Sequence, residues 1–236
     1  MKKFFLGVIP ARKGSKGVKN KNLQKIGDET LVKIAAVESK KSKFLNEIVC
    51  TSDSKKILNE AKLAGILTIK RPKKLASDKS STWDVVKHVL NVMKMKKKIV
   101  DYVVILQPTT PFRSHKQIDE AIKEMLKQKK DSCISVKKSA YPPEWMFWEK
   151  KNTNVAAKKT GLTNRQQTKV ALHPNGYIYI MKSSMIFKNP ILPQSKTLIF
   201  KMSNIFSVNI DNYQDLELAR VLHKNKKYLK KIKING

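Results

Sequence analysis

Short, continuously apolar segments alternate along the chain with longer amphipathic ones. The apolar segments predict strands at Phe4–Ile9, Glu47–Thr51, Ile66–Ile69, Tyr102–Leu106, Ser132–Val136, Tyr177–Met181 and Ile205–Ile210. The amphipathic segments predict helices at Thr30–Lys41, Lys55–Ala64, Thr82 to about Lys97, His115–Lys127 and Tyr213–Lys224. Strands without polar alternation are buried on both faces. We therefore expect an α/β, Rossmann-like domain with a mostly parallel sheet and helices on both faces.

The alternation stops between Tyr141 and about Thr168. This segment contains aromatic residues, prolines and polar residues without helical periodicity. We predict a small arm at about residues 140–170, inserted into a single domain of residues 1–236.

Composition narrows the class of protein. The chain has 236 residues, of which 41% are hydrophobic, so it can bury a full core. No apolar run reaches the ~18 residues that a membrane span needs. Its two cysteines, Cys50 and Cys133, lie in predicted strands, as expected of reduced core thiols. We expect a cytoplasmic protein that has no membrane partner.

The formal net charge of +32 has two interpretations. A strongly basic chain is typical of nucleic-acid-binding proteins, and this alternative stays open. However, only five of the 50 basic residues are arginines, and the lysines are scattered rather than clustered. A general bias toward lysine explains such a pattern without a nucleic-acid partner. Arginine binds phosphate and carboxylate bidentately, which lysine cannot do, so Arg12, Arg71, Arg113 and Arg165 are candidate anion-binding residues. Arg220 lies on an amphipathic predicted helix, and we expect a structural role for it.

A basic loop directly follows the first predicted strand. It reads Pro10-Ala11-Arg12-Lys13-Gly14-Ser15-Lys16-Gly17, with Lys21 and Asn22 a few residues later. Ligands of open α/β sheets bind beyond the carboxyl ends of strands. Backbone N–H groups of a Gly/Ser loop at this place suit phosphate. The Walker A and Gly-x-Gly-x-x-Gly patterns are both absent.

Five ordered blocks resemble the CMP-sialic acid synthetase (acylneuraminate cytidylyltransferase) family. The first is the loop just described. The others are Arg71-Pro72-Lys73-Lys74-Leu75-Ala76-Ser77-Asp78 with Thr82, Leu106-Gln107-Pro108-Thr109-Thr110-Pro111-Phe112-Arg113, Arg165-Gln166-Gln167 with Asn175-Gly176-Tyr177-Ile178-Tyr179, and Ser207-Val208-Asn209-Ile210-Asp211 with Asp215. The blocks span about residues 4 to 220.

The resemblance implies an enzyme that transfers CMP from CTP to the C2 hydroxyl of a nine-carbon sugar acid and releases pyrophosphate. Arg12 and Lys21 would neutralise the triphosphate, and Ser15 with the loop amides would cradle it. Asn22, Arg71 and Thr82 would complete the CTP-binding site. Gln107, Arg165 and Gln166 would bind the sugar. Mg²⁺ is the implied cofactor, with Asp211 and Asn209 as its ligands, and Arg12, Lys21 and Asp211 are the implied catalytic residues.

The same resemblance implies a homodimer formed through the arm and a role in polysaccharide biosynthesis. Activation of the eight-carbon sugar Kdo on the same scaffold stays open as an alternative.

Two positions depart from the family pattern. Asn209 stands where many members have the first metal-binding aspartate, which also leaves a catalytically weakened relative open. Gln167-Thr168-Lys169 follows Arg165-Gln166, where the family often has Leu-Pro.

Overall fold

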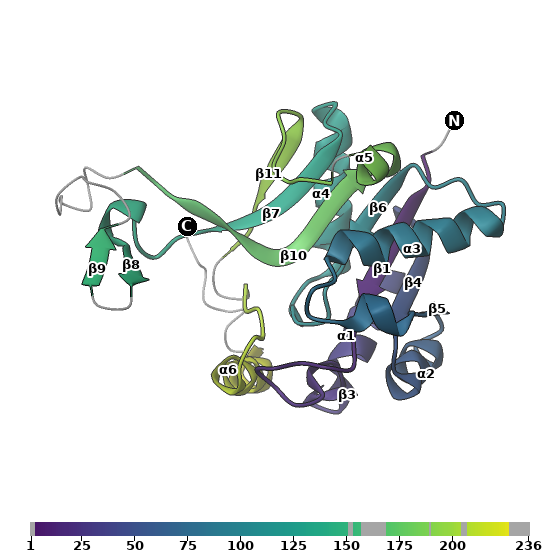
Figure 1. The fold of residues 1–236 in the computed structure, drawn as a ribbon, viewed down its shortest axis with the longest axis horizontal. Coiled ribbons are helices and arrows are strands. Elements are labelled where there is room, and N and C mark those ends of the chain that lie inside the picture. The colour runs from purple at the N-terminus through teal and green to yellow at the C-terminus, as the bar shows by residue number, and fades with distance from the viewer. Residues whose placement is uncertain (1–2, 151–152, 157–168, 189, 204–206, 227–236) are drawn as a thin grey trace.

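A seven-stranded sheet forms the centre of the computed structural model, which describes residues 3–150, 153–156, 169–188, 190–203 and 207–226 (Figure 1). Its order is β11-β7-β10-β6-β1-β4-β5. The strands are β1 (Phe5–Pro10), β4 (Leu45–Ser52), β5 (Leu67–Lys70), β6 (Tyr102–Ile105), β7 (Ser132–Lys138), β10 (Leu172–Lys182) and β11 (Thr197–Lys201). β10 is antiparallel to both its neighbours, and the other paired strands are parallel. The predicted mostly parallel α/β sheet is confirmed.

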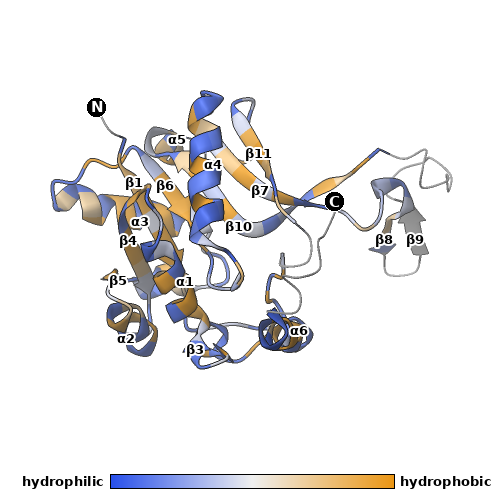
Figure 2. Ribbon diagram, turned by 180° about the vertical axis from the view of Figure 1, so that it is seen from behind, coloured by the Kyte–Doolittle hydropathy of each residue, from blue (hydrophilic) through white to orange (hydrophobic). Residues whose placement is uncertain are grey.

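Helices cover both faces of this sheet, as predicted. The helices are α1 (Leu31–Lys40), α2 (Lys55–Leu63), α3 (Thr82–Met95), α4 (His115–Lys127), α5 (Ser183–Lys188) and α6 (Tyr213–Lys224). Apolar residues of α1, α2 and α4 share one buried cluster, whereas those of α3 and α5 share another. The outward side of α4 is hydrophilic (Figure 2). α6 packs beside the sheet in a third, smaller cluster.

The central strand β1 shows why its segment is apolar throughout. Phe5 and Ile9 belong to the cluster on one face, and Leu6 and Val8 to that on the other. Successive side chains of a strand point to opposite faces, so both sets must be apolar when both faces are covered. Full burial of such a side chain contributes about 1.5–3 kcal/mol.

The helices begin at polar caps that the sequence supplies. Ser114 and Asn212 each form a capping box, with Gln117 and Asp215 respectively, at the starts of α4 and α6. These reciprocal bonds satisfy backbone N–H groups that a helix start leaves unpaired. No helix in the described part of the chain is long and apolar enough to span a membrane.

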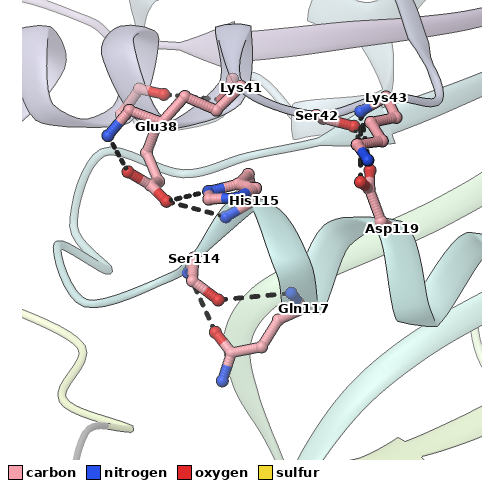
Figure 3. Close-up of polar contacts among 10 residues, drawn as sticks. Glu38, Lys41, Ser42, Lys43, Ser114, His115, Gln117 and Asp119 are labelled. Atoms are coloured by element: carbon pink, nitrogen blue, oxygen red, sulfur yellow. Dashed lines mark hydrogen bonds and ion pairs between the residues drawn. The ribbon is translucent and has the colours of Figure 1, made fainter.

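A polar cluster ties α1 to α4 (Figure 3). The Glu38 carboxylate accepts the backbone N–H of His115 at 2.9 Å and lies 2.7 Å from His115 Nδ1 and 3.0 Å from Lys41 Nζ. Burial alone would raise the pKa of Glu38, but these donors outweigh it and lower the pKa to about 2. Nearby, Asp119 accepts bonds from the Ser42 hydroxyl and the Lys43 backbone.

The predicted strand at Ile205–Ile210 is wrong for its described part, residues 207–210. Ile210 is buried against α6, and its N–H bonds to the carbonyl oxygen of Thr109 in a loop, at 2.9 Å. The apolar pattern here arises from packing against a helix rather than from sheet pairing. The strand at the edge of the sheet next to β7 is β11, which the sequence pattern did not predict.

Within the predicted arm, β8 (Phe147–Lys150) and β9 (Thr153–Ala156) form a separate antiparallel hairpin. It lies away from the sheet, beyond the long strands β7 and β10 (Figure 1). Tyr141, Phe147 and Trp148 are each at least 60% exposed, which leaves a solvent-facing aromatic surface.

Candidate active site

A cleft of about 340 Å³ lies at the carboxyl ends of β1, β5 and β6. The sequence predicted eight residues that line it: Arg12, Ser15, Lys21, Asn22, Arg71, Thr82, Gln107 and Asp211. A ninth, Asn209, is hydrogen-bonded to Asp211. Arg165 and Gln166 lie outside the described residues. Segments that are up to 199 positions apart in the sequence thus meet in one cleft because parallel strands end at the same edge of the sheet.

Arg12 and Lys16 are both paired with Asp78. Arg12 Nη1 lies 2.6 Å from one Asp78 carboxylate oxygen, and Lys16 Nζ lies 3.0 Å from the other. Hydrogen bonds from Lys16 and Arg12 lower the pKa of Asp78. Asp78 is solvent-exposed, so screening keeps these pairs weak. A phosphate in the cleft can therefore compete for the same two cations.

Arg71 and Asn22 are buried at the base of the cleft. Arg71 Nη2 donates to the Thr51 carbonyl oxygen at 2.9 Å, and its Nε is buried without a partner in the described structure. Burial lowers the pKa of this guanidinium. Asn22 Nδ2 donates to the carbonyl oxygen of Arg12 at 2.8 Å, which fixes the backbone of the basic loop. Asn22 therefore holds the loop in place, and Arg71 supplies fixed positive charge.

The N-terminus of α3 opens into the cleft. Thr82 is the first residue of this helix and lines the cavity. Ser81 caps the helix, and its hydroxyl accepts the N–H of Asp84 at 3.1 Å. The partial positive charge of a helix N-terminus favours an anion at this position.

Lys21, Asp211 and Asn209 form a linked polar group at the cleft. Lys21 Nζ lies 3.2 Å from Asp211 Oδ1 and donates to the Ile210 carbonyl oxygen at 2.8 Å. Asn209 Nδ2 donates to Asp211 Oδ2 at 2.8 Å. Asp211 does not cap α6, because Asn212 performs this role. Asp211 therefore has no capping duty that would explain its position.

These residues also suit a magnesium ion. Asn209 Oδ1 is buried without a hydrogen-bond partner in the described structure, next to the Asp211 carboxylate. The described residues contain no group of three or more His, Cys, Asp or Glu that could hold a metal. One carboxylate and one amide oxygen are hard ligands, and Mg²⁺ in nucleotide sites takes most of its remaining ligands from phosphate and water. The donor set therefore fits Mg²⁺ that arrives with a nucleotide.

Gln107 faces this group across Gly176. A Cβ atom on Gly176 would lie 3.3 Å from Gln107 Oε1 and 3.6 Å from Asn209 Cγ. Gly176 also has a φ of 78°, which glycine adopts without strain. The small residue keeps the space between the two amides open.

Arg113 does not line the cleft, although the scarcity of arginine made it a candidate anion-binding residue. It is only 3% exposed, and its Nη1 donates to Gln107 O at 3.1 Å, Thr110 Oγ1 at 2.6 Å and Tyr177 O at 3.1 Å. Burial lowers the pKa of Arg113 to about 10. Arg113 therefore links the Gln107 loop to β10 through these hydrogen bonds.

Sequence reasoning assigned no role to Asp78, although it lies within a matching block. The signal was available, because Asp78 is the only acidic residue between Lys70 and Ser81. Nor did sequence reasoning assign different roles to the two glycines of the basic loop, Gly14 and Gly17.

A profile of the cytidylyltransferase family matches residues 6–234, nearly the whole chain. This chain belongs to the cytidylyltransferase family. The predicted resemblance is confirmed, and so is the enzyme class, nucleotidyltransferase, at the level of the family.

Curated relatives of this cytidylyltransferase include proteins whose names state an acidic sugar. It is 28% identical to the N-acylneuraminate cytidylyltransferase of Escherichia coli O18:K1:H7, with 96% of the chain and 54% of that relative covered, so it spans about half of that protein. It is 30% identical to the post-translational flagellin modification protein B of Campylobacter coli, with 94% and 96% covered. It is also 30% identical to the CMP-N,N'-diacetyllegionaminic acid synthase of Legionella pneumophila, with 92% and 95% covered.

A solved structure of similar fold is that of CMP:2-keto-3-deoxy-manno-octonic acid synthetase complexed with CTP. The TM-score is 0.70 at 15% identity, and 94% of this cytidylyltransferase and 99% of that chain are covered. At this identity the similarity establishes the fold of the chain and not its substrate.

Proposed function

We propose that this cytidylyltransferase transfers CMP from CTP to the C2 hydroxyl of a nonulosonic acid, a nine-carbon sugar acid of the sialic acid type. The observation that carries the proposal is the convergence of Arg12, Lys21, Arg71 and Asp211 on one cleft. Three cations and a helix N-terminus suit a triphosphate, and the neighbouring carboxylate suits its metal ion. The cleft thus matches the chemistry that the names of the relatives state.

Each cation has its own part in binding the nucleotide. Arg12 and Lys16 would release Asp78 and bind phosphate oxygens, with Ser15 and the loop amides beside them. Lys21 Nζ is held by the Ile210 carbonyl oxygen and the Asp211 carboxylate, so its charge would lie beside the metal ligand and neutralise the triphosphate there. Arg71 is held in one position by its bond to the Thr51 carbonyl oxygen, so it would bind the nucleotide in one fixed orientation.

The reaction is a displacement at the α-phosphorus. The C2 hydroxyl oxygen of the sugar forms a bond to this phosphorus, and the bond to the oxygen that bridges to the β-phosphate breaks. Pyrophosphate leaves with that bridging oxygen and its electron pair, and the hydroxyl proton is released. Arg12 and Lys21 would stabilise the charge that builds up on the leaving group, which is the main task of a protein in such a step.

When bound, Mg²⁺ supplies positive charge to the phosphate oxygens. Asp211 and Asn209 would hold it, with Lys21 orienting the Asp211 carboxylate through its 3.2 Å contact. This assignment rests on the unpartnered Asn209 Oδ1 and the adjacent carboxylate.

Gln107 is the described residue that we assign to the acceptor, and Arg165 and Gln166 remain assigned to it from the sequence. The names of the relatives include sialic and legionaminic acid types, which favours a nine-carbon acceptor. Kdo is the second candidate acceptor. The product would be an activated sugar for polysaccharide biosynthesis, formed in the cytoplasm, and we propose a homodimer with the exposed aromatic arm at its interface.

The test is a pyrophosphate-release assay with CTP, Mg²⁺ and a panel of sialic, legionaminic and pseudaminic acids and Kdo. Release that requires one of the nine-carbon acids and follows its concentration supports the proposal. Release with Kdo alone would identify Kdo, the second candidate, as the acceptor. Retention on DNA at physiological salt, without any release, would favour a nucleic-acid-binding protein instead.

A further inference from the structure

Two glycines of the basic loop have different surroundings. A Cβ atom built on Gly14 meets nothing within 4 Å. A Cβ atom built on Gly17 would lie 1.9 Å from the carbonyl oxygen of Asp211 and 3.1 Å from its carbonyl carbon. Both of these contacts are with backbone atoms, so no side-chain rotation can relieve them. The loop therefore touches the proposed metal-binding segment at Gly17.

Conformational freedom does not explain this glycine. The glycines with positive φ in the described structure are Gly27, Gly65 and Gly176, and Gly17 is not among them. A left-handed backbone is therefore not the reason for glycine at position 17. The reason for glycine is therefore the close approach of two segments of backbone, which is the other use of this residue type.

The segment that Gly17 contacts is held firmly. The N–H of Ile210 donates to Thr109 O at 2.9 Å, and that of Asp211 donates to Asp215 Oδ2 at 2.8 Å. Asn212 caps α6 directly after it. Since these bonds resist a shift of residues 210–212, an added methyl group at position 17 must displace either the basic loop or the Asp211 carboxylate.

We propose that Gly17 is a positioning residue that acts through Asp211. Its missing side chain lets the triphosphate loop and the metal-binding segment approach closely enough to bind one CTP and one Mg²⁺ together. Two bonds span the same gap and support this role: Lys21 Nζ bonds to the Ile210 carbonyl oxygen, and the N–H of Lys19 bonds to the Tyr213 hydroxyl at 3.3 Å. The inference rests on the proposed function, because it names CTP and Mg²⁺ as the ligands.

The test measures the coupling between the two ligands rather than turnover. Calorimetry gives the CTP dissociation constant with Mg²⁺ and with EDTA, and their ratio is the coupling factor. Chelation of Mg²⁺ by free CTP contributes equally for every variant and cancels in the comparison. We expect Gly17→Ala to lower the coupling factor about tenfold or more, because a displacement of about 1 Å is enough to disrupt such a site.

Two matched variants separate this effect from others. Gly14→Ala changes the same loop without a clash with other protein atoms, so any effect on CTP affinity should be equal with Mg²⁺ and with EDTA, and the coupling factor and melting temperature should keep their wild-type values. Gly65→Ala introduces strain at a φ of 74° between α2 and β5, before the amino end of β5 and not at its carboxyl end where the cleft lies, and should lower the melting temperature but not the coupling factor. If Gly17→Ala does not fold, Tyr213→Phe removes one bond between the loops without a clash. It should lower the coupling factor about fivefold, the ratio that one net hydrogen bond is worth.

The inference would be overturned if Gly17→Ala had the same coupling factor as Gly14→Ala. If Gly17→Ala does not fold, the same coupling factor in Tyr213→Phe as in Gly14→Ala would overturn it. Failure of the proposed function has a different signature, namely no CTP binding by the wild-type protein under either condition.

Discussion

The phosphate side of the cleft and its proposed metal side differ in how their polar groups are satisfied. On the phosphate side, Arg12 and Lys16 share Asp78, and Asn22 fixes the loop backbone. On the metal side, Asn209 Oδ1 is buried without a partner in the described structure.

The comparison shows two ways of preparing a site. Exposed ion pairs are weak, so Arg12 and Lys16 can replace their bonds to Asp78 by bonds to phosphate at little cost in free energy. A buried unpaired oxygen costs about 1–3 kcal/mol until a ligand satisfies it. The metal side therefore stores a cost that a cation can remove, whereas the exposed pairs of Asp78 do not, and the buried Arg71 Nε stores a cost that an anion can remove.

The largest effect is expected from Asp211→Asn. It removes the only carboxylate of the proposed metal site but keeps the shape of the side chain. We expect turnover to fall about 10²–10³-fold, the range for loss of a charge-stabilising group. A Mg²⁺ titration of turnover checks this. Ser114→Ala is the control, since it removes the α4 cap rather than a group beside Asp211, costs about 0.5–2 kcal/mol of stability, and should leave the metal dependence unchanged. Full activity in Asp211→Asn would remove Asp211 from the metal site.

The next effect tests the phosphate side. Arg12→Lys keeps the charge but loses bidentate contact with phosphate, a difference of about 1.5–3 kcal/mol. We expect kcat/KM for CTP to fall about ten- to hundredfold in steady-state assays. Lys116→Ala, an exposed change at the start of α4, should have no such effect. Wild-type kinetics and CTP affinity in Arg12→Lys would show that this guanidinium does not contact phosphate.

Asn209→Asp addresses the metal side with a smaller effect. It replaces the 2.8 Å hydrogen bond to Asp211 by two like charges, which destabilises the metal-free protein, and it adds a charged ligand. We expect half-saturation at an about fivefold lower Mg²⁺ concentration and a larger rise in melting temperature on adding Mg²⁺. An unchanged Mg²⁺ requirement would place Asn209 outside the metal site.

The smallest effect is expected from Glu38, which links α1 to α4. The pKa of Glu38 is lowered from 4.5 to about 2, so its contribution to stability is present above pH ~4.5 and is lost as the pH falls toward 2. We expect Glu38→Gln to lower the free energy of unfolding by about 1–3 kcal/mol at neutral pH and to flatten its decline between these pH values. Urea denaturation at several pH values measures both. A parallel decline in the two proteins would exclude Glu38 as the titrating group.

Sequence reasoning was most successful where a pattern has one physical cause. The doubly covered strands and capped helices were predicted because burial and capping act over a few adjacent residues. The strand predicted at Ile205–Ile210 was wrong because packing against α6 produces the same apolar pattern as a sheet. β11, an edge strand, lacks the buried pattern that would have revealed it.

The candidate site shows the same limit. Motifs named the residues that meet in the cleft, but they did not show that Asp78 pairs with Arg12 or that Arg113 links the Gln107 loop to β10. Nor did they show that Gly17 touches Asp211, which is 194 positions away. These relations depend on long-range packing, which no local pattern records.

The central claim is that the cleft transfers CMP from CTP to a sugar acid. Phosphorus NMR of a reaction that contains CTP, Mg²⁺ and a nonulosonic acid measures this directly. We expect a new phosphodiester signal to grow together with pyrophosphate, only when the sugar acid is present, and to be nearly absent with Asp211→Asn. Consumption of CTP to CMP without a phosphodiester signal, or no consumption with any sugar acid of the panel, would contradict the account.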